Sequence, residues 1–200
     1  MSPIKTVQSS AYAQTHTNSS IINFCLGQPP TSLLPLNMFR SAAMARFSEN
    51  QDPVMLQYGA AKGFIGFRQE VAKFVADTCS INATHPDTFM VTTGNSQTIS
   101  HSAMTFSKTK KLVLVEEPTY FLAHDIFREL GLDLEGIYAG KDGIDNYRFH
   151  IISDEPYNLF HMNGSAVPPL ASYDDSGLVV SLGSFSKILA PGLRLGNNIH

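Results

Sequence analysis

Short apolar runs alternate with stretches of helical periodicity along most of the 200 residues of this chain. The runs at 89–93, 112–115, 150–153 and 178–182 are nearly continuous in apolar residues, as expected for strands buried on both faces. Between them, apolar residues recur every three or four positions, which is typical of helices that pack on a sheet. The pattern predicts an α/β fold with a mostly parallel sheet and helices on both faces.

The segment before the first strand is expected to hold two helices, at 36–47 and 64–78. The second has one apolar face, formed by Phe67, Val71, Phe74, Val75 and Thr78. The first 20 residues are rich in Ser, Thr and Gln and predict a disordered arm, so the folded part is expected to be 21–200. No internal repeat or convincing linker divides that part, so a single domain is expected.

Each expected strand ends in a polar cluster, and these clusters are the main chemical signal of the chain. They are Gly94-Asn95-Ser96-Gln97, Glu116-Glu117-Pro118-Thr119-Tyr120, Asp154-Glu155-Pro156-Tyr157 and Gly183-Ser184-Phe185-Ser186-Lys187. Parallel strands bring their carboxyl ends to one edge of a sheet, and ligands of open α/β sheets bind at that edge. The sequence therefore predicts one binding site assembled from the four strand ends.

Lys187 is the most informative single residue. It follows an apolar strand, and no acidic residue lies within ten positions on either side of it. An ammonium group in such surroundings is expected to have a lowered pKa and to act as an amine that forms a Schiff base. Arg194, seven residues later, suits a phosphate or a carboxylate. Together they indicate a phosphorylated aldehyde cofactor.

The other polar residues have two interpretations each. Gly94-Asn95-Ser96 is more often a plain helix start, but its amides and the helix dipole also suit a phosphate. Asp154 is a turn residue or a carboxylate that faces a protonated ring nitrogen. Tyr157, three residues later, can reach the same ligand. Tyr120 packs in the core or stacks on a flat heterocycle.

Composition excludes several classes of protein. The net charge of −3 and the lack of a basic stripe argue against nucleic acid as a partner. Two cysteines, Cys25 and Cys79, form no disulfide framework and are typical of a reducing compartment. No apolar run approaches the roughly 20 residues of a membrane span. We therefore expect a cytoplasmic protein. A mitochondrial leader is the alternative, although the first arginine is Arg40.

The chain also lacks several familiar catalytic motifs. Its seven histidines show no HExxH or His-rich spacing, so no metal site is expected. GxxxxGK[ST], GxGxxG and GxSxG are all absent, which argues against the usual nucleotide-binding loops and against a serine hydrolase.

Five segments, taken together and in order, resemble a known family. The class I/II aminotransferases, the fold-type I enzymes that use pyridoxal 5′-phosphate, have segments similar to all five. The segments here are QYGAAKGFIGFR, TTGNSQ, EEPTYF, DEPYNLF and SFSKILAPGLRLG. The nearest branch is the 2-aminoadipate/kynurenine type or the valine–pyruvate type. The resemblance runs from about residue 23 to the end of the chain and implies the large domain of that fold.

The resemblance also implies a role for each candidate residue. Lys187 would carry the cofactor as a Schiff base and move a proton, Asp154 would pair with the ring nitrogen and Tyr157 with the ring hydroxyl. Tyr120 would stack on the ring. The phosphate would be held by Gly94, Asn95, Ser96, Ser184 and Arg194. Tyr58 would reach the phosphate of a neighbouring subunit, which implies a homodimer, and Gly27 would line the substrate pocket.

Two departures from the family reduce what the resemblance implies about activity. The family places an Asn-Pro-x-Gly segment, with its own strand and helix, between the stacking tyrosine and the aspartate. Here only 33 residues separate Tyr120 from Asp154, and the chain contains no Asn-Pro. It also ends 13 residues after Lys187, before the family's small C-terminal domain and its substrate-binding arginine. We expect an incomplete large domain that is poorly stable or needs a partner.

Three hypotheses follow. The first is an aminotransferase that moves an amino group from an amino acid to a 2-oxo acid, with activity impaired in this shortened form. The second is a fragment or splice product that binds cofactor, or pairs with a full-length subunit, without catalysis. The third is another enzyme of the same fold, such as a lyase or a cyclopropane-carboxylate synthase-like protein.

Overall fold

The computed structural model describes residues 27–49, 53–82, 84–137, 149–161 and 164–199. The expected arm at 1–20, the apolar run at 21–26 and Cys25 lie outside the described residues. The helices and strands that follow one another in the described part are α1 (Leu36–Glu49), α2 (Ile65–Cys79), β1 (Phe89–Thr92), α3 (Asn95–Phe106), β2 (Leu112–Glu116), α4 (Phe121–Glu129), β3 (Asp133–Ile137), β4 (Ile151–Asp154), β5 (Val179–Ser184) and β6 (Gly196–Ile199). Short 3₁₀ turns lie at η2 (Thr31–Leu33), η3 (Pro53–Leu56), η4 (Pro86–Thr88), η5 (Leu170–Tyr173) and η6 (Pro191–Leu193).

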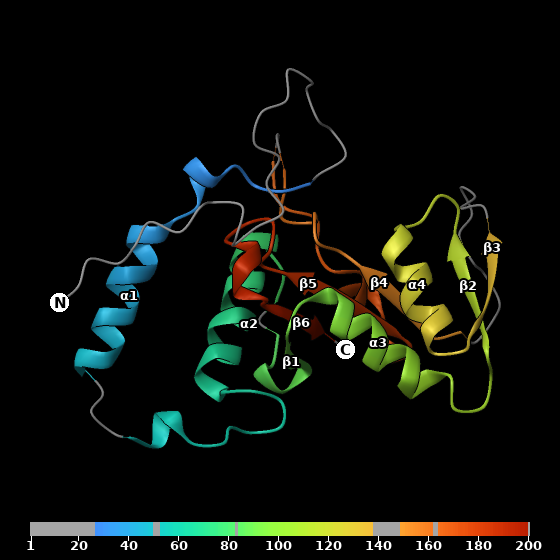
Figure 1. Ribbon diagram of the computed structural model, residues 1–200, viewed down its shortest axis with the longest axis horizontal. Helices are drawn as coiled ribbons and strands as arrows, with labels where there is room; N and C mark the ends of the chain where they lie inside the picture. Colours follow the sequence, from blue (N-terminus) through green and yellow to red (C-terminus); the bar gives the residue numbers. More distant parts are fainter. Residues whose placement is uncertain (1–26, 50–52, 83, 138–148, 162–163, 200) are drawn as a thin grey trace, which may run out of the picture.

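The strands form one larger sheet and one separate pair (Figure 1). The larger sheet has the order β1-β6-β5-β4, in which β4 is parallel to β5 and β6 runs antiparallel to both β1 and β5. The second sheet is the parallel pair β2-β3. The α/β class is confirmed. The sheet is mixed rather than uniformly parallel, because β6 inserts between two strands that share one direction.

Helices cover both faces of the larger sheet, as the sequence predicts. On one face, Val71 and Val75 of α2 pack with Phe89 of β1 and Ile199 of β6. The opposite face is covered by α3 and α4, whose buried residues pack against β5 and also against partly buried side chains of β2 and β4. The two sheets therefore share one hydrophobic core, although no strand pairing joins them among the residues that the structure describes.

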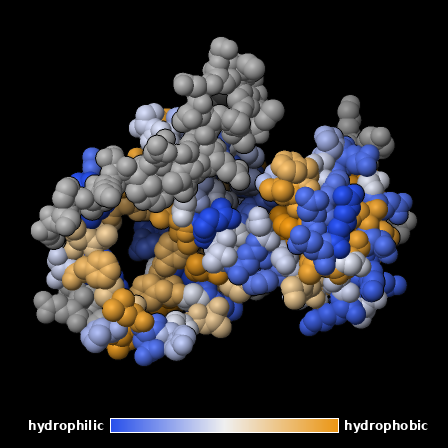
Figure 2. Space-filling view, viewed as in Figure 1, coloured by the Kyte–Doolittle hydropathy of each residue, from blue (hydrophilic) through white to orange (hydrophobic). Residues whose placement is uncertain are grey.

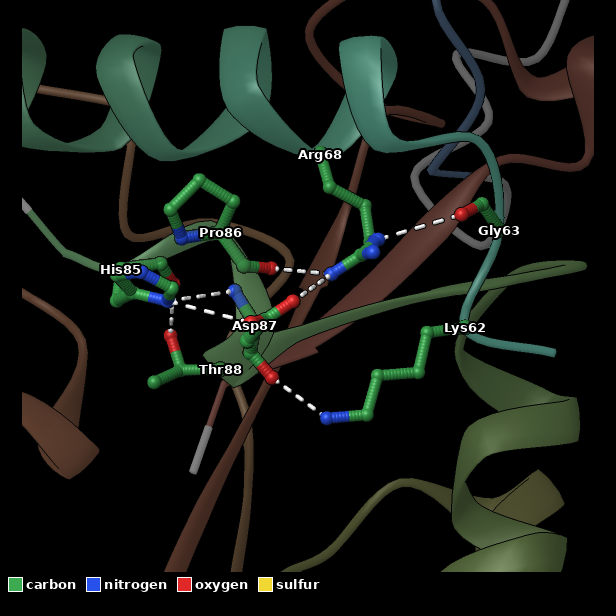
Figure 3. Close-up of polar contacts among 7 residues, drawn as sticks. All are labelled: Lys62, Gly63, Arg68, His85, Pro86, Asp87 and Thr88. Atoms are coloured by element: carbon green, nitrogen blue, oxygen red, sulfur yellow. Dashed lines mark hydrogen bonds and ion pairs between the residues drawn. The ribbon is translucent and has the colours of Figure 1, made fainter. Parts of the chain in front are cut away.

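The helix α2 follows its predicted periodicity with one exception. Val71 and Val75 are 4% and 7% exposed, whereas Phe74 is 40% exposed and packs its ring 6.2 Å from that of Phe185. Arg68 joins the buried face although it was not predicted to, because its guanidinium finds polar partners (Figure 3). It donates to the backbone carbonyls of Gly63 and Pro86 and to the carboxylate of Asp87.

Many large apolar side chains near the start of the described residues are exposed. They lie on α1, on η3 and in the adjoining loops, and Figure 2 shows apolar surface over that end of the molecule. They include Leu33, Leu36, Met38, Met44, Phe47, Val54, Leu56 and Tyr58. A surface of this kind is typical of a segment that packs against another protein or another copy of the chain.

Candidate functional site

The predicted site lies at the carboxyl ends of β1, β4 and β5, together with the turn that follows β2. Lys187 stands in the turn after β5, and its Nζ donates a hydrogen bond of 2.5 Å to the carbonyl oxygen of Gly27. A Cβ atom added to Gly27 would lie 3.6 Å from that Nζ and 3.4 Å from the hydroxyl of Tyr157. Lys187 and Tyr157 therefore both approach Gly27.

Asp154 ends β4 and contacts the start of α3. The side-chain nitrogen of Asn95 donates hydrogen bonds to Asp154 Oδ1 at 2.5 Å and to the carbonyl oxygen of Leu182 at 3.3 Å. Burial raises the pKa of Asp154; the bond from Asn95 opposes that shift, and the nearby Glu155 adds to it. Asn95 thus fixes the carboxylate and favours its charged form.

Arg194 lies over the N-terminus of α3. Its backbone is left-handed, with φ of 47°, and its guanidinium approaches the carbonyl oxygen of Thr93 at 3.5 Å. Gly94 has φ of 89°, and a Cβ added there would lie 2.5 Å from Arg194 Nη2. The positive φ therefore favours glycine at position 94, and a side chain there would also displace the Arg194 guanidinium. A guanidinium over the N-terminus of a 12-residue helix forms a site for an anion.

Two serines complete the region around this helix end. Ser184 lies at the end of β5, where its hydroxyl accepts a hydrogen bond from the amide of Ser186 and shapes the turn that carries Lys187. Ser96 is the second residue of α3 and is exposed. Both hydroxyls are thus on elements that converge near Gly94 and Arg194.

Tyr120, which follows β2, belongs to the same site although β2 is in the other sheet. Burial raises its pKa most, and the charges of Asp154 and Tyr157 raise it further, while Arg194 lowers it. Tyr120 therefore lies within electrostatic range of all three. Its ring is 48% exposed and faces Phe121 edge-on, with 5.3 Å between ring centroids. The exposed ring leaves a flat surface for stacking.

Tyr58 is separate from this group. Its side chain is 99% exposed, and the loop that carries it lies next to the exposed apolar end of the molecule. The family resemblance implies that Tyr58 reaches the site of a neighbouring subunit, and that role stays a prediction.

Sequence reasoning missed two contacts of the site. It assigned Asn95 only to a phosphate, whereas its side chain binds Asp154. It gave no role to Glu155, whose carboxylate accepts hydrogen bonds from the amide of Leu170 and from the side chains of Ser181 and Asn158. A glutamate beside an aspartate at a strand end signals that one of the pair faces the core, because neighbouring residues of a strand point to opposite faces.

The arrangement combines an amine, a carboxylate, phenol hydroxyls and an anion site at one sheet edge. In the described residues, no carboxylate forms an ion pair with Lys187 or Arg194. The part of the chain that the structure describes also holds no group of three or more metal-ligating side chains. None of its helices has both the length and the apolar character needed to cross a membrane.

Comparison with known proteins identifies relatives over most of the chain. The family model described as aminotransferase class I and II matches residues 19–138. The aromatic-amino-acid aminotransferase 1 of Thermococcus litoralis is 26% identical over 226 residues, a match that covers 89% of this chain and 54% of the relative. The chain spans about half the length of the curated relatives it matches.

Solved structures give the same fold. An α-aminoadipate aminotransferase of Thermus thermophilus, complexed with N-(5′-phosphopyridoxyl)-L-leucine, superimposes with a TM-score of 0.72 at 24% identity over 88% of this chain and 55% of that one. A kynurenine aminotransferase of Pyrococcus horikoshii, in complex with PMP, superimposes with a TM-score of 0.75 at 22% identity over 97% of this chain and 62% of that one. These likenesses establish the fold that carries the site.

Proposed function

Because this chain belongs to the class I and II aminotransferase family, we propose that its strand-end site binds pyridoxal 5′-phosphate and serves transfer of an amino group from an amino acid to a 2-oxo acid. The observation that carries the proposal is the surroundings of Lys187. Its amine donates to the carbonyl oxygen of Gly27 and has no carboxylate partner among the described residues. The Tyr157 hydroxyl also approaches Gly27, 3.4 Å from the position that a Cβ would take there. An amine left in such a position is available to react with an aldehyde.

The residues at the site fit this cofactor at both of its ends. Arg194 and the N-terminus of α3 suit the phosphate, because the first is a cationic donor and the second presents backbone amides. In the described part of the chain, no carboxylate forms an ion pair with Arg194. The buried Oδ1 of Asn95 has no partner among the described atoms, so the same corner holds a polar atom that a ligand can satisfy. Gly27 leaves room beside Lys187 that a larger residue would reduce.

When bound, pyridoxal 5′-phosphate supplies an aldehyde that condenses with amines and a pyridinium ring that withdraws electrons from the substrate carbon. Lys187 would hold the aldehyde end and would take and return the proton at the Cα of the amino acid. Asp154 would keep the ring nitrogen protonated, since a carboxylate next to it stabilises the cation. The hydrogen bond that Asn95 donates to the Asp154 carboxylate fixes the position of that carboxylate.

The remaining residues would orient the cofactor. Tyr157 would donate to or accept from the ring hydroxyl, and Tyr120 would stack on the ring with its exposed face. Ser96, Ser184 and Arg194 would hold the phosphate, and Gly94 would let its backbone amides approach closely. Gly27 would leave space for the substrate beside Lys187.

A second copy of the chain is part of the proposal. Tyr58 is fully exposed next to a large apolar surface on α1 and η3, which fits a face that is covered in a homodimer. The Tyr58 hydroxyl of the second copy would then reach the phosphate. Sedimentation at several concentrations tests this part separately from cofactor binding.

A second candidate is a chain that binds the cofactor with little turnover. It is favoured by the match to the Thermococcus litoralis relative, which extends over 226 residues and so exceeds the 200 residues of this chain. The relative thus carries residues inside the matched region for which this chain has no counterpart. A large domain built without them would keep the cofactor residues and lose part of the framework around the substrate.

A spectrophotometric titration tests the proposal and separates the two candidates. Pyridoxal 5′-phosphate added to the purified chain should give a visible absorption band that saturates, and Lys187→Ala should not give the band. Lys73→Ala serves as the matched control, because it removes a lysine whose side chain is exposed and whose ion pair with Asp77 lies in solvent. Failure of the parent chain to give the band refutes the proposal. A band that an added amino acid does not change identifies the second candidate.

A further inference from the structure

The carboxylate of Glu155 joins three parts of the chain behind the site. Its Oε1 accepts hydrogen bonds from the Ser181 hydroxyl of β5 at 2.8 Å and from the Leu170 amide of η5 at 3.0 Å. Its Oε2 accepts a hydrogen bond of 2.9 Å from the side-chain nitrogen of Asn158, three residues further along its own turn. The Ser181 hydroxyl accepts in turn from the amide of Ala171 at 2.9 Å, which directs its proton to Glu155.

Glu155 and Asp154 are neighbours in sequence but face opposite sides of the sheet. Asp154 contacts Asn95 of α3 on one side. On the other side, burial raises the pKa of the Cys79 thiol of α2, and the charge of Glu155 raises it further. Neighbouring residues of an extended chain point to opposite faces, so this arrangement follows from the backbone. Glu155 therefore acts on the site through the residues that it holds.

The turn that Glu155 holds is the turn that carries Tyr157. It follows β4 directly, and the amide of Phe160 closes it with a hydrogen bond of 2.9 Å to the carbonyl oxygen of Tyr157. The amide of Glu155 fixes the start of the turn by donating to the carbonyl oxygen of Leu182 at 3.0 Å. Asn158 fixes the other side through its bond to the Glu155 carboxylate. Tyr157 thus stands between two anchored residues.

Tyr157 depends on an anchored backbone because its own side chain is exposed. It is 58% exposed, and its ring lies 6.1 Å from the ring of Phe160, a residue next to the same turn. A contact so close in sequence does not fix the turn relative to the sheet. The hydrogen bonds that Glu155 accepts do fix it, because their donors in β5 and η5 lie outside the turn.

Glu155 also adjoins the turn that carries Lys187. It lines one small cavity together with Ser184 and Phe185, the residues that lead into that turn. Its partner Ser181 is 1% exposed and lies three residues before Ser184 on β5. We infer that Glu155 is a positioning residue of the site, which fixes the turn of Tyr157 to the strand that leads to Lys187. The importance of that position for a cofactor rests on the proposed function.

Hydrogen exchange of the full chain without cofactor tests the anchoring. In Glu155→Ala the amides of Asn158 and Phe160 should exchange roughly 10-fold faster than in the parent, because the turn then opens without breaking a bond to β5. Amides of α3 are the internal reference and should not change. Glu155→Gln keeps a side-chain oxygen for Ser181 and Leu170, and the Asn158 amide can rotate to meet the new NH₂ group. This variant should exchange like the parent.

Two further variants control for a general loss of stability and for failure to fold. Arg68→Ala removes hydrogen bonds to Gly63 and Pro86 instead, and should leave the turn amides at the parent rate. Asn158→Ala removes the anchor on the turn side, should speed exchange of the Phe160 amide, and decides the test if Glu155→Ala does not fold. Turn amides at the parent rate in the deciding variant overturn the inference. Equal acceleration in Arg68→Ala or in Glu155→Gln also overturns it.

Binding of pyridoxal 5′-phosphate tests the link to Tyr157. Glu155→Ala and Tyr157→Phe should each weaken binding by roughly 3- to 10-fold. The double variant should bind about as well as the weaker single variant, because Glu155 acts through Tyr157. Losses that multiply in the double variant overturn the inference. A parent chain that gives no absorption band refutes the proposed function instead, and the exchange rates then decide the role of Glu155 by themselves.

Discussion

Asn95 Nδ2 donates a hydrogen bond of 2.5 Å to Asp154 Oδ1, joining two residues that are 59 positions apart in the sequence. The contact links the first turn of α3 to the end of β4. It also acts against the burial that raises the pKa of Asp154. A carboxylate that must face a cationic ring nitrogen has to be charged, so Asn95 supports the proposed role of Asp154 before any ligand arrives.

Removing this hydrogen bond should change the titration of Asp154. Asn95→Ala should raise the pKa of Asp154 further, because the interaction that favours its charged form is lost. The measurement is the chemical shift of the Asp154 carboxyl carbon as a function of pH. Ser96→Ala, one residue along the same helix, is the control and should leave the titration unchanged. An Asp154 that titrates alike in Asn95→Ala and in the parent contradicts this account.

Asp154→Asn should separate stability from cofactor binding. A raised pKa means that the folded chain disfavours the carboxylate, so the free energy of unfolding falls as the pH rises from 3.8 through the raised value and stays low above it. Asn removes this penalty, and at neutral pH the variant should unfold at a slightly higher temperature than the parent. The same variant should bind pyridoxal 5′-phosphate more weakly. Lower stability together with unchanged binding would refute both assignments.

Arg194 should supply much of the affinity for the phosphate. Arg194→Ala removes a charged donor over the N-terminus of α3, and the binding constant for pyridoxal 5′-phosphate should fall by roughly 10- to 100-fold. Pyridoxal without the phosphate is the matched ligand: its binding should be nearly the same in the parent and the variant. An equal loss for both ligands would instead indicate that Arg194→Ala disturbs the fold.

Stability in acid should depend on Asp174, which binds the turn before β5. Its carboxylate accepts hydrogen bonds from the hydroxyl and amide of Ser176 and from the amides of Leu178 and Val179, and they lower its pKa to about 2. A lowered pKa stabilises the fold above 3.8, and that contribution is lost as the pH falls towards 2. Chemical unfolding at several pH values should show a steeper decline between pH 4 and 2 in the parent than in Asp174→Asn. Identical slopes would refute this role.

Arg68 should stabilise the fold through the contacts of Figure 3. It is 6% exposed, and its guanidinium donates to the backbone oxygens of Gly63 and Pro86. Arg68→Ala should lower the free energy of unfolding by about 2 kcal/mol, because two partly buried carbonyls lose a charged donor. Lys73→Ala, on the exposed face of the same helix, should cost much less, since its ion pair with Asp77 lies in solvent. Equal losses in the two variants would contradict this interpretation.

The sequence predicts the strands of the site well and the sheet as a whole less well. β1, β2, β4 and β5 were predicted because their apolar runs are continuous and end in polar clusters. β6, with the sequence GNNI, has no apolar run, and it forms because β1 and β5 pair with it on both sides. β3, with the sequence DLEGI, was missed for a similar reason: pairing with β2, rather than its own pattern, makes it a strand.

The candidate site was predictable to the extent that its residues follow strands in sequence. Lys187, Asp154 and Tyr157 stand directly after apolar runs, and topology alone brings them to one edge. Which side chains touch was not predictable, because the bond from Asn95 to Asp154 depends on how α3 packs on the sheet. The apolar runs alone also do not show that β2 and β4 are separate, since local pattern does not determine which strands pair.

The central claim is that Lys187 is the amine at which this chain holds pyridoxal 5′-phosphate. The most direct measurement is reduction of the mixture of chain and cofactor with borohydride, followed by peptide mapping by mass spectrometry. The cofactor mass should appear on the peptide that contains Lys187 at an occupancy well above that of surface lysines such as Lys73. A label spread evenly over the lysines, or concentrated on another one, would contradict the account.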